Sequence, residues 1–305
     1  MTAVDTTERR DGIDAFAAGA MVVLTLSWGL NQVLVKVANA GYNPVLLTVG
    51  RSAIAAVLVF LWCHWRGIRI FERDGTLPAG ILVGVLFGIE FVLMFFGLDY
   101  TSAARGTLVF NTMPFWVLLG AHFWLGEKIT ATKFAGLVLA FAGVVLVFSD
   151  KGSLGAGGGL KGDLMLLAAG AAWGATIIII KVSRLNTASA EKTLLYQLVV
   201  SSIFSIPLVP LAGPLLREPS ILATASLLVQ AVYVVSFTYV VWFWLMRRYP
   251  ASGLSSFTFL SPVFGVVFAV ALLGEPFSWR ILVAMLLIVA GLIIVNRPAR
   301  RAAAG

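Results

Sequence analysis

Long apolar runs alternate with short polar connections along the whole chain. A helix of about 20 apolar residues is long enough to cross the roughly 30 Å hydrocarbon core of a lipid bilayer. The pattern therefore predicts an all-α integral membrane protein with ten transmembrane helices. The predicted spans are 15–38, 44–65, 78–98, 103–125, 130–148, 162–182, 191–212, 220–246, 252–273 and 279–296.

Short motifs recur at a nearly constant distance and divide the chain into two halves. Trp28-Gly29 returns as Trp173-Gly174, 145 residues later. The chain is therefore predicted to contain two copies of a five-helix unit. Because five is odd and consecutive spans alternate in direction, the second copy would cross the membrane inverted, as in many secondary transporters. The predicted parts are a cytoplasmic N-terminal tail (1–14), a first repeat (15–148), a glycine-rich linker (149–161), a second repeat (162–296) and a cytoplasmic C-terminal tail (297–305).

The fourth helix of each predicted repeat contains a proline at the same place. Residues 111–127 read NTMPFWVLLGAHFWLGE, and residues 259–275 read FLSPVFGVVFAVALLGE. A proline inside a helix frees a backbone carbonyl, which in lipid tends to face protein or a water-filled cavity. Pro114 and Pro262 are therefore predicted hinges beside a central cavity, with a simple packing kink as the alternative. Each segment ends in Gly-Glu, which predicts a turn whose carboxylate favours the N-terminal end of the next helix.

Composition supports the membrane assignment and excludes several classes of protein. The 305 residues are 60% hydrophobic and 12% charged, whereas soluble domains average about 45–50% and 25%. The single cysteine allows no Cys-based metal site, and the two histidines lie in different spans, which argues against any metal site. No HExxH, P-loop or G-x-S-x-G motif is present. The chain is therefore predicted not to be an enzyme and to need no cofactor or metal.

The net charge of +8 is explained by orientation in the membrane rather than by a nucleic-acid partner. If the N-terminus is cytoplasmic, the cytoplasmic segments hold fifteen Lys and Arg residues and the outer segments five. Positive charge concentrates on the cytoplasmic side of membrane proteins. Both termini are therefore predicted to be cytoplasmic. The outer residues are Arg105, Lys151, Lys161, Arg217 and Arg280.

Taken together, these motifs resemble the EamA family of the drug/metabolite transporter superfamily. The shared features are a Trp-Gly in the first helix of each repeat, a proline and a following Gly-Glu in the fourth, and a glycine-rich fifth. Within the family the chain looks most like the YddG-type exporters of aromatic and other neutral amino acids. The resemblance implies a bacterial inner-membrane exporter that moves small metabolites by alternating access through a cavity between the repeats. An uncoupled channel-like facilitator, or an exporter of other metabolites or drugs, is the alternative.

Tryptophan and polar side chains near the span centres are the candidates for substrate contact. A buried indole N–H needs a hydrogen-bond partner, so central tryptophans are predicted to point inward. Polar residues at helical spacing from them add the few hydrogen-bonding groups that a small-molecule site needs. The alternative is that these side chains fill space and join helices. The predicted substrate-binding residues are Trp28, Asn31, Gln32, Asn111, Thr112, Trp116, Trp173, Thr176, Tyr239, Trp242, Ser255, Thr258 and Phe259.

Charged residues inside the spans are the candidates for coupling. A charged side chain costs about 2.5–3.5 kcal/mol at the centre of a membrane helix. Glu90 could couple proton movement to transport, attract the ammonium of an amino acid, or be a structural glutamate paired with Lys36 or Arg51. Lys36 could bind a substrate carboxylate. Both basic side chains also lie near enough to the outer surface to extend toward it.

Overall fold

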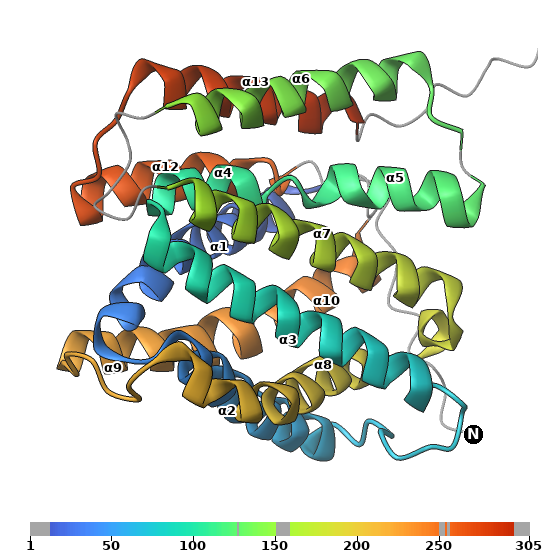
Figure 1. Cartoon of the computed structure of the whole chain (residues 1–305). Coiled ribbons are helices and arrows are strands. Elements are labelled where there is room, and N and C mark those ends of the chain that lie inside the picture. Colours follow the sequence, from blue (N-terminus) through green and yellow to red (C-terminus); the bar gives the residue numbers. More distant parts are fainter. Residues whose placement is uncertain (1–12, 127, 151–158, 250–253, 255–256, 296–305) are drawn as a thin grey trace, which may run out of the picture.

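A computed structural model describes residues 13–126, 128–150, 159–249, 254 and 257–295. The regular elements in these ranges are helices, which lie roughly side by side in a layered bundle (Figure 1). The described residues therefore agree with the predicted all-α class.

The helices follow the predicted spans closely. Those of the first half are α1 (Ala15–Gly41), α2 (Pro44–Trp65), α3 (Leu77–Tyr100), α4 (Ala103–Phe110), α5 (Met113–Leu125) and α6 (Ala131–Ser149). Those of the second half are α7 (Leu160–Val182), η1 (Arg184–Thr187), α8 (Ala190–Ser205), η2 (Ile206–Ala212), α9 (Ile221–Leu228), the π-helix η3 (Val229–Phe237), α10 (Thr238–Arg248), α12 (Leu260–Leu273) and α13 (Trp279–Val295).

Length and composition separate the described helices into two groups. Eight helical stretches are long and apolar enough to cross a membrane, counting α4 with α5, α8 with η2, and α9 with its continuation as single stretches. Helices α12 and α13 are shorter apolar helices. The structure thus shows a multi-pass arrangement, and α12 covers the second part of the predicted span 252–273.

Helix starts coincide with capping residues in the sequence. The Asn43 side chain accepts hydrogen bonds from the backbone N–H groups of Val45 and Leu46, and Pro44 follows it. Ser102 and Ser189 cap α4 and α8 in the same way. These side chains satisfy N–H groups that have no acceptor inside the helix, so the local sequence helps to fix where these three helices begin.

The fourth predicted span is two helices rather than one kinked helix. α4 ends at Phe110 and α5 begins at Met113, so Pro114 lies in the first turn of α5. Pro262 likewise lies in the first turn of α12. A proline costs little there, because the first N–H groups of a helix lack intrahelical acceptors. The prediction of prolines in helix interiors is therefore wrong: each helix restarts just before its proline.

The two halves of the chain are interleaved. α3 packs against α7 and α8, α1 packs against α12 and α9, and α2 packs against α8 and η3. α6 packs against α13, and Figure 1 shows these two helices as one outer layer above α4, α5 and α12. The protein interior is therefore built from helices of both halves.

Equivalent glycines make equivalent close contacts in the two halves. A Cβ added at Gly29 of α1 would lie 2.8 Å from Phe264 Cβ, and one added at Gly174 of α7 would lie 2.6 Å from Trp116 Cβ. Gly174 follows Gly29 by 145 residues, and Phe264 follows Trp116 by 148. Only glycine permits both approaches. The helix pairs α1–α12 and α7–α5 thus repeat one packing arrangement.

Candidate functional site

Trp28 of α1 contacts α10, where its ring has a polar partner. Its Nε1 donates a hydrogen bond to Thr238 Oγ1 at 3.0 Å. Its ring meets the edge of Trp242, with ring centroids 5.6 Å apart. Both rings border a buried apolar cluster that contains Met21 and Leu24. Two predicted site residues are therefore in contact, and Thr238 supplies the hydrogen-bond acceptor that a buried indole needs.

The other two central tryptophans have different neighbours. Trp173 of α7 stacks on Phe110, with centroids 5.2 Å apart and rings 19° from parallel. Trp116 of α5 meets the edge of Phe141 at 6.2 Å, and its buried Nε1 has no hydrogen-bond partner. The three tryptophans thus contact different helices, and one cavity wall that contains all three stays a prediction.

Several predicted polar site residues hydrogen-bond to their own helix backbone. Asn111 Nδ2 donates to the Thr107 carbonyl at 2.8 Å, and Thr112 Oγ1 donates to the Val109 carbonyl at 2.7 Å. These two bonds satisfy carbonyls at the break between α4 and α5. Thr176 Oγ1 donates to a carbonyl one turn earlier in α7. In the structure these side chains bond to the backbone of their own helices, and no contact of theirs indicates a ligand.

Asn31 and Gln32 present polar atoms that the protein does not use. Gln32 is 4% exposed, and its Nε2 contacts Met94 Sδ of α3 at 3.8 Å. The buried Asn31 Oδ1 and Gln32 Oε1 have no hydrogen-bond partner. Since buried polar atoms are normally satisfied, these two oxygens are available to a ligand.

The remaining predicted site residues belong to the second repeat. Phe259 is buried at the start of α12, and Thr258 lies in the turn before it. Tyr239 of α10 is half-buried. Ser255 lies outside the described residues.

Lys36 is occupied by the end of a neighbouring helix. Its Nζ donates to the carbonyl of Leu98 at 3.1 Å and to the carbonyl of Thr101. These carbonyls belong to the last turn of α3 and to the residue that follows it, where a cation interacts favourably with the helix dipole. Lys36 therefore stabilises a helix end, and its role in binding a substrate carboxylate stays a prediction.

Arg51 is buried inside the protein rather than extended toward the membrane surface. Its side chain is 1% exposed, and its guanidinium carbon lies 3.5 Å from the centre of the Phe91 ring. Phe87 and Phe95 lie at 6.0 and 5.7 Å. The expectation that Arg51 reaches the surface is therefore wrong, because three aromatic rings of α3 surround it. The signal in the sequence was an arginine within an otherwise apolar run.

Glu90 interacts with Arg51 and has one carboxyl oxygen without a hydrogen-bond partner. The carboxylate is 2% exposed and interacts electrostatically with Arg51. Tyr239 lies close enough to interact with both charges. Glu90 Oε2 has no hydrogen-bond partner, and neither do Nε and Nη2 of Arg51. Of the two partners expected for a structural Glu90, Arg51 interacts with it, and the choice between a structural role and the two functional roles stays a prediction.

The energetic balance at this pair is unfavourable without a further partner. A charge at a helix centre costs about 2.5–3.5 kcal/mol, and a desolvated cation–π contact returns about 2 kcal/mol. The rings of α3 thus offset much of the cost for Arg51, while Glu90 is compensated by its electrostatic interaction with Arg51 and its Oε2 has no hydrogen bond. Unsatisfied buried charge is typical of sites where function overrides stability.

A second buried pair, Arg105 and Asp163, joins α4 to α7 and is fully connected. Both side chains are at most 1% exposed. Arg105 donates to both carboxylate oxygens of Asp163 and to the Asp150 carbonyl, and Thr101 Oγ1 donates to Asp163 Oδ1 at 2.6 Å. The charge count placed Arg105 in an outer connection, but the structure places it inside the bundle. Residue spacing gave no sign of this pairing, which joins residues 58 positions apart.

Glu275 sits at a helix N-terminus, but not at that of its own helix. Its carboxylate accepts hydrogen bonds from the backbone N–H of Ala103 at 2.6 Å and of Ala104 at 2.9 Å. These residues begin α4 in the other half of the chain. The prediction that this carboxylate favours the next helix along the chain is therefore wrong, although the attraction to a helix N-terminus is as expected. Gly126-Glu127 carries the same prediction, and Glu127 lies outside the described residues.

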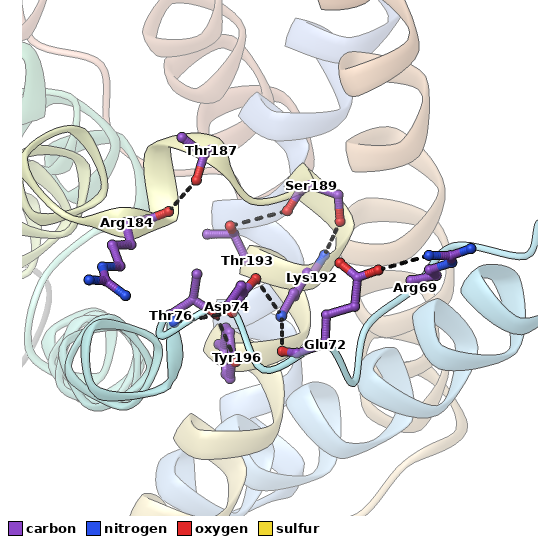
Figure 2. Close-up of polar contacts among 10 residues, drawn as sticks. All are labelled: Arg69, Glu72, Asp74, Thr76, Arg184, Thr187, Ser189, Lys192, Thr193 and Tyr196. Carbon is purple, nitrogen blue, oxygen red and sulfur yellow. Dashed lines mark hydrogen bonds and ion pairs between the residues drawn. The ribbon is translucent and has the colours of Figure 1, made fainter. Parts of the chain in front are cut away.

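A third charged cluster joins the α2–α3 connection to the start of α8 (Figure 2). Lys192 Nζ donates to Asp74 Oδ2 at 2.8 Å and to the Glu72 carbonyl at 3.1 Å. Thr76 Oγ1 donates to Asp74 and lies 3.1 Å from the Tyr196 hydroxyl. Hydrogen bonds from Lys192 and Thr76 hold the pKa of Asp74 well below its usual range. This cluster ties the two halves together at one end of the bundle.

Metal binding and surface hollows do not add a second candidate site. Among the described residues no group of three His, Cys, Asp or Glu side chains is placed to hold a metal ion. A hollow of about 320 Å³ lies beside His64 and Phe71, and one of about 470 Å³ lies beside Leu93 and Met165. Neither is lined by a predicted site residue.

The chain is similar to curated transporters over nearly its whole length. It is 28% identical over 280 residues to the uncharacterized transporter YoaV of Bacillus subtilis, covering 89% of this chain and 94% of the relative. It is 28% identical over 298 residues to a probable amino-acid metabolite efflux pump of Salmonella typhimurium, covering 92% and 94%. An S-adenosylmethionine/S-adenosylhomocysteine transporter of Chlamydia trachomatis is 25% identical, covering 87% and 84%.

A solved structure and a family profile agree on the fold. One crystal structure superimposes with a TM-score of 0.64 at 19% identity, covering 92% of this chain and 96% of that one, which is a likeness in fold alone. The profile of the EamA-like transporter family matches residues 15–149 and again residues 160–297. The chain is therefore a multi-pass membrane protein that belongs to the EamA-like transporter family.

Proposed function

We propose that the protein is an inner-membrane exporter of small metabolites, with neutral or aromatic amino acids as its substrate class. Family membership supports transport, and two relatives named probable amino-acid metabolite efflux pumps support the substrate class. The interior is mostly apolar and aromatic with a few unused polar atoms, which suits a small amphiphilic ligand. Both termini are cytoplasmic in this proposal, as the distribution of Lys and Arg favours.

The proposed mechanism is alternating access between two inverted five-helix repeats. The observation that carries it is the pair of equivalent contacts at Gly29 and Gly174, which pack α1 on α12 and α7 on α5 in the same manner. A break from α4 precedes α5 just before Pro114, and α12 likewise begins just before Pro262. Discontinuous helices at corresponding places of two repeats are typical of transporter binding sites. In this proposal the repeats rock about these two prolines.

Transport by the purified protein in liposomes is the direct test. Vesicles would be loaded with a panel of labelled neutral amino acids, and efflux would be measured with and without a pH gradient. Flux of phenylalanine, tryptophan or leucine above that of empty vesicles is the expected result. Flux of S-adenosylmethionine without flux of any neutral amino acid would replace the proposed substrate class with that of the Chlamydia relative.

The same vesicles test coupling and the tryptophan contacts. If Glu90 couples proton movement to transport, Glu90→Gln removes the response to the pH gradient. A wild type that ignores the gradient would instead make the protein an uncoupled facilitator. Alanine at Trp28, Trp116 or Trp173 should reduce flux if these rings contact substrate, and unchanged flux in all three variants would remove them from the site.

A further inference from the structure

Two ionisable side chains in the protein interior have unused hydrogen-bonding atoms, which are donors on one side chain and an acceptor on the other. Arg51 of α2 offers the unpaired donors Nε and Nη2, and Glu90 of α3 offers the unpaired acceptor Oε2. Both residues are at most 2% exposed, so water at the surface does not satisfy them. They interact electrostatically, which places them near one another. The site thus presents a guanidinium and a carboxyl group that both have unused hydrogen-bonding positions.

A purely structural ion pair looks different in this same protein. Arg105 and Asp163 are equally buried, yet the arginine donates to both carboxylate oxygens and to a backbone carbonyl. The chain can therefore close a buried Arg–carboxylate pair completely. The incomplete hydrogen bonding of Arg51 and Glu90 is therefore specific to their location on α2 and α3.

The surroundings of the pair are suited to a ligand with an apolar part. The rings of Phe91, Phe95 and Phe87 lie 3.5, 5.7 and 6.0 Å from the Arg51 guanidinium. Next to α2 packs the π-helix η3, a helix type that often marks functional sites. Gln230 in η3 is fully buried, and neither atom of its amide has a partner. Unused polar groups thus occur on α2 and on the two helices α3 and η3 that pack against it.

We propose that Arg51 and Glu90 bind the two charged groups of an α-amino acid. Nε–H and Nη2–H of Arg51 donate to the α-carboxylate, for which a guanidinium is the best-matched partner. Glu90 Oε2 accepts from the α-ammonium, and the aromatic rings of α3 contact the side chain. Bound substrate completes the hydrogen bonding of both residues. The assignment rests on the proposed function, and it makes Arg51 and Glu90 the specificity-determining residues of that site.

Ligand analogues test the assignment on the unmodified protein. L-Phenylalanine carries both charges, phenethylamine lacks the carboxylate, and 3-phenylpropanoate lacks the ammonium. The expected result is that phenylalanine raises the thermal stability of the detergent-solubilised protein and competes for transport, while each analogue is weaker by roughly tenfold or more. Equal potency of phenethylamine and phenylalanine would overturn the carboxylate contact, and equal potency of 3-phenylpropanoate would overturn the ammonium contact.

Matched variants locate the contacts. Arg51→Lys keeps the charge but loses the planar pair of donors. It should reduce phenylalanine flux roughly tenfold and reduce the preference for phenylalanine over phenethylamine. Glu90→Gln should reduce the preference for phenylalanine over 3-phenylpropanoate. Arg69→Lys is the control, because Arg69 is exposed and pairs with Glu72 at the surface. Each variant would first be shown to be monodisperse by size-exclusion chromatography.

The outcomes separate this assignment from the proposed function. A wild type that carries no neutral amino acid overturns both. A wild type that carries phenylalanine while Arg51→Lys and Glu90→Gln keep the full preference over both analogues overturns only the assignment. A variant that fails to fold leaves the analogue series on wild type to decide.

Discussion

Two buried arginine–carboxylate pairs in this protein differ in how completely they are bonded. Arg105 and Asp163 join α4 to α7, and the guanidinium bonds both carboxylate oxygens and a carbonyl. Arg51 and Glu90 lie on α2 and α3 and leave three polar atoms unpaired. The two pairs are therefore alike in burial and differ in hydrogen-bond satisfaction, and it is the incompletely bonded pair that we propose binds a ligand.

The physical reason is the cost of removing charge from water. A buried pair recovers this cost only when its geometry is good and the remaining donors and acceptors are also bonded. The Arg105 pair meets this condition within the protein. The Arg51 pair meets it only in part, through the aromatic rings of α3, so a ligand with complementary charges would gain interactions already positioned for it.

The largest expected effect comes from breaking the fully bonded pair of Arg105 and Asp163. Arg105→Gln leaves Asp163 buried with Thr101 as its main remaining partner, and breaking such a pair costs about 3–5 kcal/mol. We expect a clear drop in the midpoint of thermal unfolding in detergent, or loss of folded protein. A midpoint equal to that of wild type would show that the Arg105 pair is not a structural contact.

A smaller effect is expected beside the closed pair, at Glu275. Glu275→Ala removes the carboxylate that accepts from Ala103 and Ala104 at the start of α4. Loss of a cap costs about 1–2 kcal/mol. The measurement is thermal unfolding, with Glu72→Ala as the control because the Glu72 side chain forms an exposed pair. If both variants shift the midpoint equally, the contact to α4 contributes nothing of its own.

Removing both members of the open pair should change stability least among the buried sites. The double variant Arg51→Met with Glu90→Gln removes two ionisable groups that the fold does not fully bond. The free energy of unfolding should therefore fall by less than about 1 kcal/mol, or rise. The matched double variant Arg105→Met with Asp163→Asn should be less stable than this one. Equal stability of the two double variants would remove the distinction between the pairs.

The smallest effect is expected at the partly solvated Asp74 cluster of Figure 2. The pKa of Asp74 is depressed below its ordinary value of 3.8, so the ion pair contributes stability above about pH 4 and loses it as pH falls toward the lower pKa of the folded state. Asp74→Asn should therefore remove a small part of the acid sensitivity between about pH 4 and lower pH. Unfolding midpoints of the variant and wild type from pH 3 to pH 7 would show this, and parallel curves would contradict it.

Residue type and position predict candidates for the site, and their role in binding substrate stays a prediction. Two of these candidates, Trp28 and Trp242, are in contact. Asn111 and Thr112 were expected to face substrate, but they donate to carbonyls at the helix break. A short polar side chain can serve either a ligand or its own backbone, and spacing does not separate these two uses.

The sequence by itself determined the membrane helices and the repeated motifs, because the transfer of an apolar run into lipid depends only on that run. Only the tertiary structure decided which charges meet. Glu275 reaches a helix start about 170 residues away, and Lys36 binds the end of α3 rather than Glu90. Such pairings depend on which helices pack together. The contrast between a closed and an open arginine pair therefore becomes visible only when both halves of the chain are in place.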